Sequence, residues 1–314
     1  MARSGPVEKS RGLSLWNLLF FVLRLGGLIR LSTWFALSLL LGAWYAFEIK
    51  IARPPMFWMG EPVPSDKMNP FTFTRILRNQ GFILGYSDLR GNSLWATYAL
   101  TSPESTSSFK PADGLISDWR AINRVPPEYY TGSGYEPGHL ASTYAIGKVY
   151  GQAAQLDAYR MTNVTPQKQG LNNKLWERLE ALEMDHYAKQ FGKIWVITGP
   201  IFDPPVERLH KSWRVEAPDA FYKIIVAPEA KTMLALVIPQ TVRGDEPLEH
   251  YVTSVDAIER RTGFDFFPEL DNAEEDRLEA SVNPVPWNLR EMAHTSAKHA
   301  GHKAENRPGS GGGS

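Results

Sequence analysis

Cysteine is absent from this chain of 314 residues. Its absence excludes a disulfide scaffold, a thiolate nucleophile and any zinc or iron–sulfur site that needs cysteine ligands. Net charge is also lacking, because 34 lysine and arginine residues balance 34 aspartate and glutamate residues. Binding of nucleic acid through bulk positive charge is therefore excluded, and any site for a polyanion must be local.

The composition is that of a folded protein. Hydrophobic residues make up 43% and charged residues 22% of the chain, which is typical of globular rather than disordered sequences. At roughly 100–200 residues per domain, the length predicts one large or two small domains. Only seven histidines are present, so any histidine chemistry must use one of these few side chains.

Near the amino terminus, residues 31–47 (LSTWFALSLLLGAWYAF) form an apolar run without charge. Its length is near the lower end of the roughly 17–25 residues that a membrane-spanning helix needs. Trp34 and Trp44 lie near its ends, as interfacial aromatic residues do. The segment before it carries Arg3, Lys9, Arg11, Arg24 and Arg30 against Glu8. The positive-inside rule then predicts a single-pass helix over 31–49 in the inner (cytoplasmic) membrane, with a cytoplasmic amino terminus and a periplasmic or extracellular remainder.

Two other interpretations of this run are a cleaved signal peptide and a buried core helix. A signal peptide is disfavoured because the run starts late and no clean small-x-small cleavage site follows it. A shorter apolar stretch, 13–23, has only about half the length needed to span a bilayer. It fits either an interfacial helix lying flat or a contact surface for another subunit.

Changes in composition divide the chain into five predicted parts. These are a cytoplasmic or interfacial segment (1–30), a transmembrane helix (31–49), a linker that contains a proline-rich stretch (50–70), a globular domain (71–292) and a disordered tail (293–314). The tail ends in GSGGGS, which is typical of an artificial linker. His299 and His302 within it could share a helix face and bind a metal, but a solvated, frayed terminus is the favoured interpretation.

The globular part combines short strands with separate helices. Strand-like runs rich in β-branched and aromatic residues cover 82–86, 94–100, 158–164, 194–198, 220–226 and 233–239. Helical periodicity covers 175–191, and a second helix is predicted over 255–262 with Gly263 as its carboxy-terminal cap. Strands and helices do not alternate as βαβ units. The pattern therefore predicts an α+β domain with a mostly antiparallel central sheet.

Three segments carry residues suited to catalysis. Residues 134–139 (GYEPGH) place His139 after a Pro-Gly turn, 162–167 read TNVTPQ, and 171–180 read LNNKLWERLE. A histidine can take a proton from water near neutral pH, and an amide oxygen is a neutral, hard ligand suited to Mg²⁺. Taken singly, a structural histidine and a helix-capping asparagine are the more common explanations.

Together, these segments resemble the DNA/RNA non-specific endonuclease family, whose sites are ββα-metal (His-Me) fingers of the endonuclease G type. The family pattern runs from Gly-Tyr-Asp-Arg-Gly-His through Ser-Asn-x-x-Pro-Gln to Leu-Asn-x-x-x-Trp-x-x-Leu-Glu. The similarity continues in order through 195–203 (WVITGPIFD), 218–226 (PDAFYKIIV), 235–240 (ALVIPQ) and 254–267 (SVDAIERRTGFDFF). It covers about 82–270, far more than a single short motif.

The resemblance implies a phosphodiesterase that cleaves DNA and RNA and leaves 5′-phosphates. His139 matches the family's general base. Asn172, four residues before Trp176, matches the single protein ligand to Mg²⁺, for which Mn²⁺ is the expected substitute, and is preferred over Asn173. Glu180 matches an acidic residue that acts on the metal through water. On an ideal helix, Asn172 and Glu180 lie about 12 Å apart along the axis and about 80° apart around it, so they cannot both ligate one ion.

The sequence departs from the family pattern directly before Gly138-His139. Glu136 and Pro137 stand where the pattern has Asp-Arg, so a carboxylate is kept as a loop brace and a phosphate-binding guanidinium is lost. Arg120, as a catalytic residue, and Arg124, as a substrate-binding residue, are the candidates to replace it, and an ordinary surface arginine is the favoured alternative for each. Asn163 and Gln167 match a family block beside the site, which makes Asn163 a candidate for site support, although hydrogen bonding in a turn or at a strand end is the favoured interpretation of both.

The leading hypothesis is a membrane-anchored, Mg²⁺-dependent, sugar-non-specific endonuclease that contacts the phosphate backbone of DNA and RNA. The alternative is a catalytically weak or inactive nuclease-fold module that assembles into a membrane complex, which Pro137 and the stretch 13–23 favour. A third hypothesis is a ββα-metal phosphodiesterase with a substrate other than nucleic acid. A homodimer or a partner in a membrane complex is left open.

Overall fold

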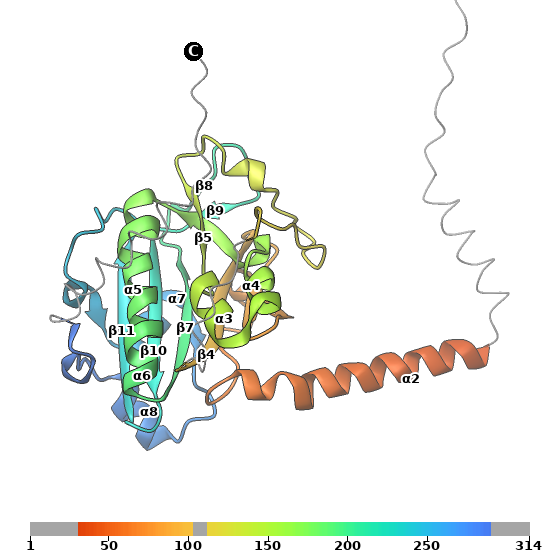
Figure 1. Cartoon of the computed structure of the whole chain (residues 1–314). Coiled ribbons are helices and arrows are strands. Elements are labelled where there is room, and N and C mark those ends of the chain that lie inside the picture. Colours follow the sequence, from red (N-terminus) through yellow and green to blue (C-terminus); the bar gives the residue numbers. More distant parts are fainter. Residues whose placement is uncertain (1–30, 103–111, 290–314) are drawn as a thin grey trace, which may run out of the picture. The chain divides into compact units, whose positions relative to one another are not determined.

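The computed structural model describes residues 31–102 and 112–289. Contacts divide the chain into two units, Met1–Arg53 and Pro54–Ser314, which we describe separately (Figure 1). The predicted segment 1–30, with its apolar stretch 13–23, and the predicted tail 293–314 lie outside the described residues.

The first unit contains the helix α2 (Leu31–Phe47), which continues as the π-helical turn η1 (Glu48–Ala52). Large apolar side chains such as Phe35, Leu40 and Trp44 are exposed in this unit. In the described part of the chain, one helix, Thr33–Met56, is long and apolar enough to cross a membrane by length and composition, with 24 residues and a mean hydropathy of 1.5. Two of the charges that follow α2 are paired, since Arg53 Nε donates to Glu48 Oε1 at 3.3 Å.

The second unit is built on a seven-stranded sheet in the order β12-β11-β10-β7-β4-β3-β2, and every neighbouring pair is antiparallel. Its strands are β2 (Arg75–Arg78), β3 (Ile83–Ser87), β4 (Asn92–Thr101), β7 (Lys193–Ile201), β10 (Ala220–Ala227), β11 (Thr232–Pro239) and β12 (Val252–Thr253). The predicted antiparallel α+β architecture is therefore confirmed.

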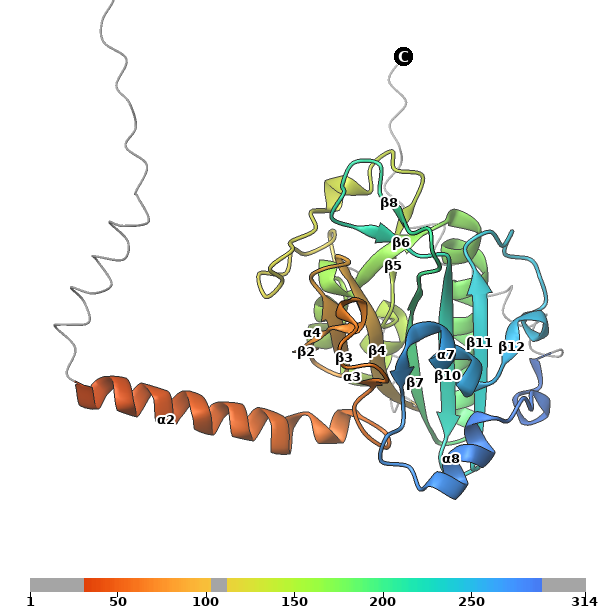
Figure 2. The ribbon, with the colours of Figure 1, turned by 180° about the vertical axis from the view of Figure 1, so that it is seen from behind.

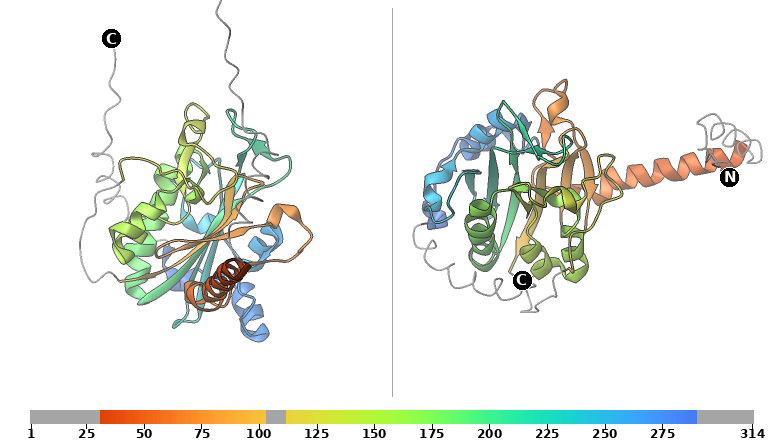
Figure 3. Two further views of the ribbon diagram at one scale, coloured as in Figure 1. Left: turned by 90° about the vertical axis from the view of Figure 1, so that its right-hand side faces the viewer. Right: turned by 90° about the horizontal axis from the view of Figure 1, so that it is seen from above.

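Helices cover both faces of this sheet (Figure 3). One face carries α3 (Thr143–Tyr150), α4 (Gln152–Ala158) and a long helix made of η6 (Leu171–Trp176), α5 (Glu177–Leu182), η7 (Glu183–Tyr187) and α6 (Ala188–Gln190). The other face carries α7 (Val255–Thr262) and α8 (Asn272–Glu279), as seen from behind in Figure 2. The alternation of side chains along β10 divides the core accordingly, because Phe221 and Ile225 join the first core while Tyr222 and Ile224 join the second.

Short elements complete the unit. Three two-stranded pairs are β1 (Val63–Pro64) with β13 (Phe264–Asp265), β5 (Glu136–His139) with β6 (Val164–Gln167), and β8 (Glu207–Arg208) with β9 (Glu216–Ala217). The 3₁₀ turns are η2 (Pro54–Met56), η3 (Pro70–Thr72), η4 (Pro127–Tyr129), η5 (Met161–Asn163), η8 (Leu248–Tyr251) and η9 (Val285–Trp287).

Five of the six predicted strands lie mainly on observed strands, whereas the sixth, 158–164, is wrong except at its last residue. Ala158 ends α4, and the chain then turns through η5 before β6 starts at Val164. The side chain of Asn163 closes this turn, because its Nδ2 donates to the carbonyl of Ala158 at 2.8 Å. The predicted helix 255–262 is confirmed as α7, and Gly263 has the left-handed φ of 74° that a glycine cap adopts.

A buried ion pair joins the sheet to the long helix. Lys223 of β10 and Glu183 are both fully buried, and Lys223 Nζ lies 2.7 Å from Glu183 Oε1. The ammonium also lies 4.3 Å from the ring centroid of Trp176, and the hydroxyl of Tyr98 donates to Glu183 Oε2 at 3.2 Å. Burial raises the pKa of Glu183, although Lys223 opposes this shift. Each charge therefore depends on the other to offset its desolvation.

The substitution Lys223→Met is expected to lower the free energy of unfolding by about 3–5 kcal/mol, because it leaves the Glu183 carboxyl buried without its partner. Urea unfolding followed by tryptophan fluorescence measures the change. The double variant Lys223→Met, Glu183→Leu removes both charges and should lose much less stability. Equal losses in the two variants would contradict the pairing argument.

Candidate active site

The segments with catalytic residues form two antiparallel strands and a helix. In β5 and β6, Glu136 is opposite Gln167 and His139 is opposite Val164. The helices α3 and α4 connect the two strands, and the long helix begins at Leu171, four residues after β6 ends. The three elements place Glu136, His139 and Asn172 within one ββα unit, which we call the finger.

Within the finger, Asn172 is held by Glu136. Its Nδ2 donates a hydrogen bond to Glu136 Oε2 at 2.9 Å and lies 3.4 Å from Asn173 Oδ1. An ionised carboxylate can only accept hydrogen bonds, so this contact fixes the amide with its nitrogen toward Glu136 and its Oδ1 turned away. Glu136 thus occupies the position of the predicted brace, and the amide oxygen of Asn172 is left available as a ligand.

The turn between β6 and the helix is braced by the end of β11. Gln240 Oε1 accepts from the backbone N–H of Lys168 at 2.8 Å, and Gln240 Nε2 donates to the carbonyl of Pro166 at 2.7 Å. Gly170 packs so closely that a Cβ there would lie 2.2 Å from the carbonyl oxygen of Val242. A side chain would not fit at this position, so the path of the chain into the first helical turn is tightly constrained.

His139 is the last residue of β5 and is partly buried. Its ring packs edge-on against Tyr159, with centroids 5.3 Å apart and an interplanar angle of 73°. The residues that follow it are fastened to Asn163. The backbone N–H of Leu140 donates to the carbonyl of Asn163 at 3.0 Å, and that of Ala141 donates to Asn163 Oδ1 at 2.9 Å. Asn163 therefore supports the strand end that carries His139, and its buried amide is committed to backbone groups.

Glu180 is joined to the same strand end by Ser142. The Ser142 hydroxyl donates to Glu180 Oε2 at 2.9 Å, and its oxygen accepts from the N–H of Ala145 as the amino-terminal cap of α3. Sequence reasoning assigned Ser142 no role, although a serine directly before a helix is a recognisable capping signal. The contact links the long helix to the chain three residues beyond His139.

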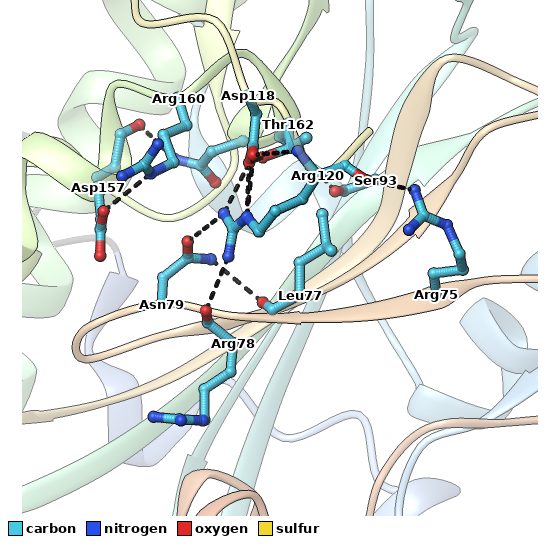
Figure 4. A network of polar contacts seen from close by, with 12 residues as sticks. Arg75, Leu77, Arg78, Asn79, Ser93, Asp118, Arg120, Asp157, Arg160 and Thr162 are labelled. Atoms are coloured by element: carbon cyan, nitrogen blue, oxygen red, sulfur yellow. Dashed lines mark hydrogen bonds and ion pairs between the residues drawn. The ribbon is translucent and has the colours of Figure 1, made fainter. Parts of the chain in front are cut away.

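Arg120 lies outside the finger in a separate polar network (Figure 4). Its Nε and Nη2 donate to Asp118, its Nη1 donates to the carbonyl of Arg78 at 2.9 Å, and its Nη2 donates to Asn79 Oδ1 at 2.7 Å. Asp118 in turn accepts from the hydroxyl of Thr162 at 2.7 Å. These contacts favour a structural role for Arg120 over the predicted contact with phosphate.

The carboxyl of Asp118 shows the strength of this network. Burial alone would raise its pKa, but the hydrogen bonds from Arg120 and Thr162 outweigh burial and hold the pKa below its usual value. Arg124, by contrast, is exposed, and its Nη2 makes one long hydrogen bond, 3.4 Å, to the carbonyl of Trp119. The guanidinium of Arg124 therefore makes fewer hydrogen bonds within the protein than the guanidinium of Arg120 does.

Gln167, which the sequence analysis matched to the family block beside the site, is the last residue of β6 in the finger. Its side chain is fully buried and lies over Gly138, where a Cβ would be 2.1 Å from Gln167 Oε1. Within residues 31–102 and 112–289, neither polar atom of its amide has a hydrogen-bond partner. A buried amide without partners is costly, so this one is suited to a ligand or a water molecule in the finger.

An antiparallel strand pair that ends in histidine, followed by a helix whose first turn presents an amide oxygen, defines a nuclease site of the ββα-metal class. The sequence model described as DNA/RNA non-specific endonuclease matches residues 65–273. The chain therefore belongs to the DNA/RNA non-specific endonuclease family, and it is a nuclease.

Similar proteins agree with this assignment. Mitochondrial endonuclease G from Bos taurus is 29% identical over 210 residues, which covers 60% of this chain and 68% of the relative. A nuclease from Nostoc is 26% identical over 235 residues, which covers 69% of this chain and 81% of the relative. The crystal structure of an EndoG/EndoGI complex shares the fold, with a TM-score of 0.55 at 23% identity over 63% of this chain and 88% of that chain.

Replacing Arg120 by alanine is expected to lower the free energy of unfolding by about 1.5–3 kcal/mol, because Asp118 loses its charged hydrogen-bond donor. Arg124→Ala is the matched control, since it removes an exposed guanidinium and should change stability by less than about 0.5 kcal/mol. Denaturant unfolding of both variants makes the comparison. If Arg120→Ala were as stable as the wild type, the network would not have the structural role described.

Proposed function

We propose that this nuclease is a membrane-anchored, Mg²⁺-dependent endonuclease that cleaves DNA and RNA without sugar preference. The hydrogen bond from Asn172 to Glu136 carries the proposal, because it presents an oriented amide oxygen within the finger. Cleavage without sugar or base preference requires contacts to the phosphate backbone only.

The donor groups of the finger fit Mg²⁺. This ion prefers hard oxygen ligands and keeps several of its waters, so one or two protein ligands suffice. Asn172 Oδ1 would hold the ion, and the buried amide of Gln167 lies across the strand pair from Glu136, which braces Asn172. When bound, Mg²⁺ would supply positive charge to the phosphate oxygens and to the leaving 3′ oxygen, and Mn²⁺ is the expected substitute.

His139 acts as the general base in this proposal. Its imidazole removes a proton from a water molecule as the water oxygen forms a bond to phosphorus. The bond from phosphorus to the 3′ oxygen breaks, and this oxygen takes a proton from water, which leaves a 3′-hydroxyl on one fragment and a 5′-phosphate on the other. The edge-on contact with Tyr159 and the backbone contacts of Asn163 limit how far the ring can move. Glu180 acts as a positioning residue, because its hydrogen bond with Ser142 holds the chain that follows His139. Arg124 contacts the phosphate backbone of the substrate.

The membrane anchor in this proposal is the helix predicted over 31–49. Its support is the exposed apolar surface of α2, the hydropathy of Thr33–Met56 and the excess of arginine and lysine before it. The positive-inside rule then puts the nuclease domain on the periplasmic or extracellular side.

The full chain, purified in detergent, should cleave plasmid DNA and single-stranded RNA with Mg²⁺ and not with EDTA. His139→Ala and Asn172→Ala are each expected to reduce the cleavage rate by about 10²–10⁴-fold, because a general base contributes that much and the metal ligand supports the same step. His210→Ala is the matched control, since this histidine is exposed and lies outside the finger. Undiminished cleavage by His139→Ala with an unchanged melting temperature would refute the assigned base.

A second candidate function is a catalytically weak module in a membrane complex. Pro137 favours it, because the family's arginine is missing there and the guanidinium of Arg120 is engaged with Asp118. The same assay separates the two, since inactivity of the folded wild type, with activity restored by Pro137→Arg, would support the weak module.

The anchor has its own test. The full chain should sediment with membranes and resist extraction with alkaline carbonate, whereas a variant lacking residues 31–53 should be released. Release of the full chain by carbonate would contradict a membrane-spanning helix.

A further inference from the structure

A cluster of acidic side chains lies on the sheet face opposite the long helix. Asp256 and Glu259 are one turn apart on α7, and Glu279 ends α8. Each offers a carboxylate oxygen, and the three oxygens lie within 4.8 Å of one another. Asp265 and Glu275 add further negative charge around Glu279. Acidic residues of α7, β13 and α8 thus lie close together.

Glu279 is the member whose environment is unexplained. Its side chain is only 3% exposed, and its Oε1 has no hydrogen-bond partner among the described residues. Two of the three arginines on these helices pair with other carboxylates, Arg261 with Asp203 and Arg277 with Glu274. A buried carboxylate normally has a cation or several donors, so a group that would satisfy it is missing from the protein itself.

The energetics of the cluster call for a positive charge. Burial and the neighbouring carboxylates raise the pKa of Glu279 to about 9 and that of Glu259 to about 7. Three carboxylates this close cannot all be ionised in a partly buried site unless a cation is bound. Protons offset the repulsion but leave Oε1 of Glu279 without a partner, whereas a divalent cation would satisfy both requirements.

The chemistry of the cluster suits Ca²⁺ better than Mg²⁺. Two oxygens on one ion can be at most twice the metal–oxygen distance apart, which is about 4.2 Å for Mg²⁺ and about 4.6–5.2 Å for Ca²⁺. The three oxygens lie within 4.8 Å of one another, which is compatible with a shared Ca²⁺. Ca²⁺ also tolerates irregular geometry and bidentate carboxylates, so water, Asp265 or Glu275 can complete its shell of six to eight oxygens.

We propose that Asp256, Glu259 and Glu279 form a Ca²⁺ site that ties α8 to α7. The site is separate from the finger, because α7 and α8 pack on the second core and the long helix packs on the first. Ile258 and Leu278 of these helices contribute to the second core beside the cluster. Bound Ca²⁺ would therefore stabilise the carboxy-terminal helices without taking part in phosphodiester cleavage.

The test uses the full chain with Asn172→Ala, which removes the metal ligand proposed for the finger. Calorimetric titration with CaCl₂ should show one saturable site. At 100 times its dissociation constant, Ca²⁺ should raise the melting temperature by about 5–10 °C.

Adding Glu279→Gln or Asp256→Asn should abolish this rise. Glu279→Gln should be at least as stable as its parent without Ca²⁺ at pH 8, because glutamine is neutral without having to take up a proton on folding. This comparison separates lost binding from misfolding.

Glu274→Gln is the matched control, because Glu274 lies on α8 outside the cluster and should leave the Ca²⁺ response intact. With Asn172 restored, Glu279→Gln should retain Mg²⁺-dependent DNA cleavage. The proposal is overturned if Ca²⁺ causes no shift, or if the shift persists in both Glu279→Gln and Asp256→Asn. A melting temperature that responds to pH and not to Ca²⁺ would show that protons alone stabilise the cluster and would overturn it as well.

Discussion

The hydrogen bond between Asn172 and Glu136 is the contact on which the proposed chemistry depends. It joins the first turn of the long helix to β5, and its donor and acceptor types leave one orientation for the amide. The surrounding residues hold the segments that make this contact. Gln240 and Gly170 fix the path of the chain into the helix, and Asn163 holds the chain that follows His139. The finger is therefore positioned from β11 and from the α4 turn as well as by its own strands.

Buried charged side chains lie on both faces of the central sheet, and they are stabilised in different ways. On the finger side, Lys223 and Glu183 form a direct ion pair that connects β10 to the long helix. On the other side, Glu259 and Glu279 lie among like charges, and the pKa of each is raised. An ion pair within the protein is complete without a ligand, whereas clustered carboxylates need protons or a cation. The two faces thus differ in what they require from solution.

The sequence predicted those elements that depend on residues close together in the chain. Short runs rich in β-branched and aromatic residues located the central strands, and Gly263 marked the end of α7. The order of the motifs identified the family and the segments of the finger. The turn before β6 was missed because Asn163 closes it with contacts to Ala141 and Ala158. The surroundings of Arg120 were missed because two of its acceptors, Arg78 and Asn79, lie about forty residues earlier in the chain. Such contacts depend on tertiary packing, which single-sequence patterns do not contain.

The most direct test of the central claim is the Mg²⁺ dependence of DNA cleavage by Glu136→Ala compared with the wild type. If Glu136 orients the metal ligand, its loss should raise the Mg²⁺ concentration needed for half-maximal cleavage by about 10–100-fold, while saturating Mg²⁺ restores much of the rate. The melting temperature provides the control for folding. An unchanged Mg²⁺ midpoint in a folded Glu136→Ala variant would contradict the account, because Asn172 would then not depend on this contact for its role.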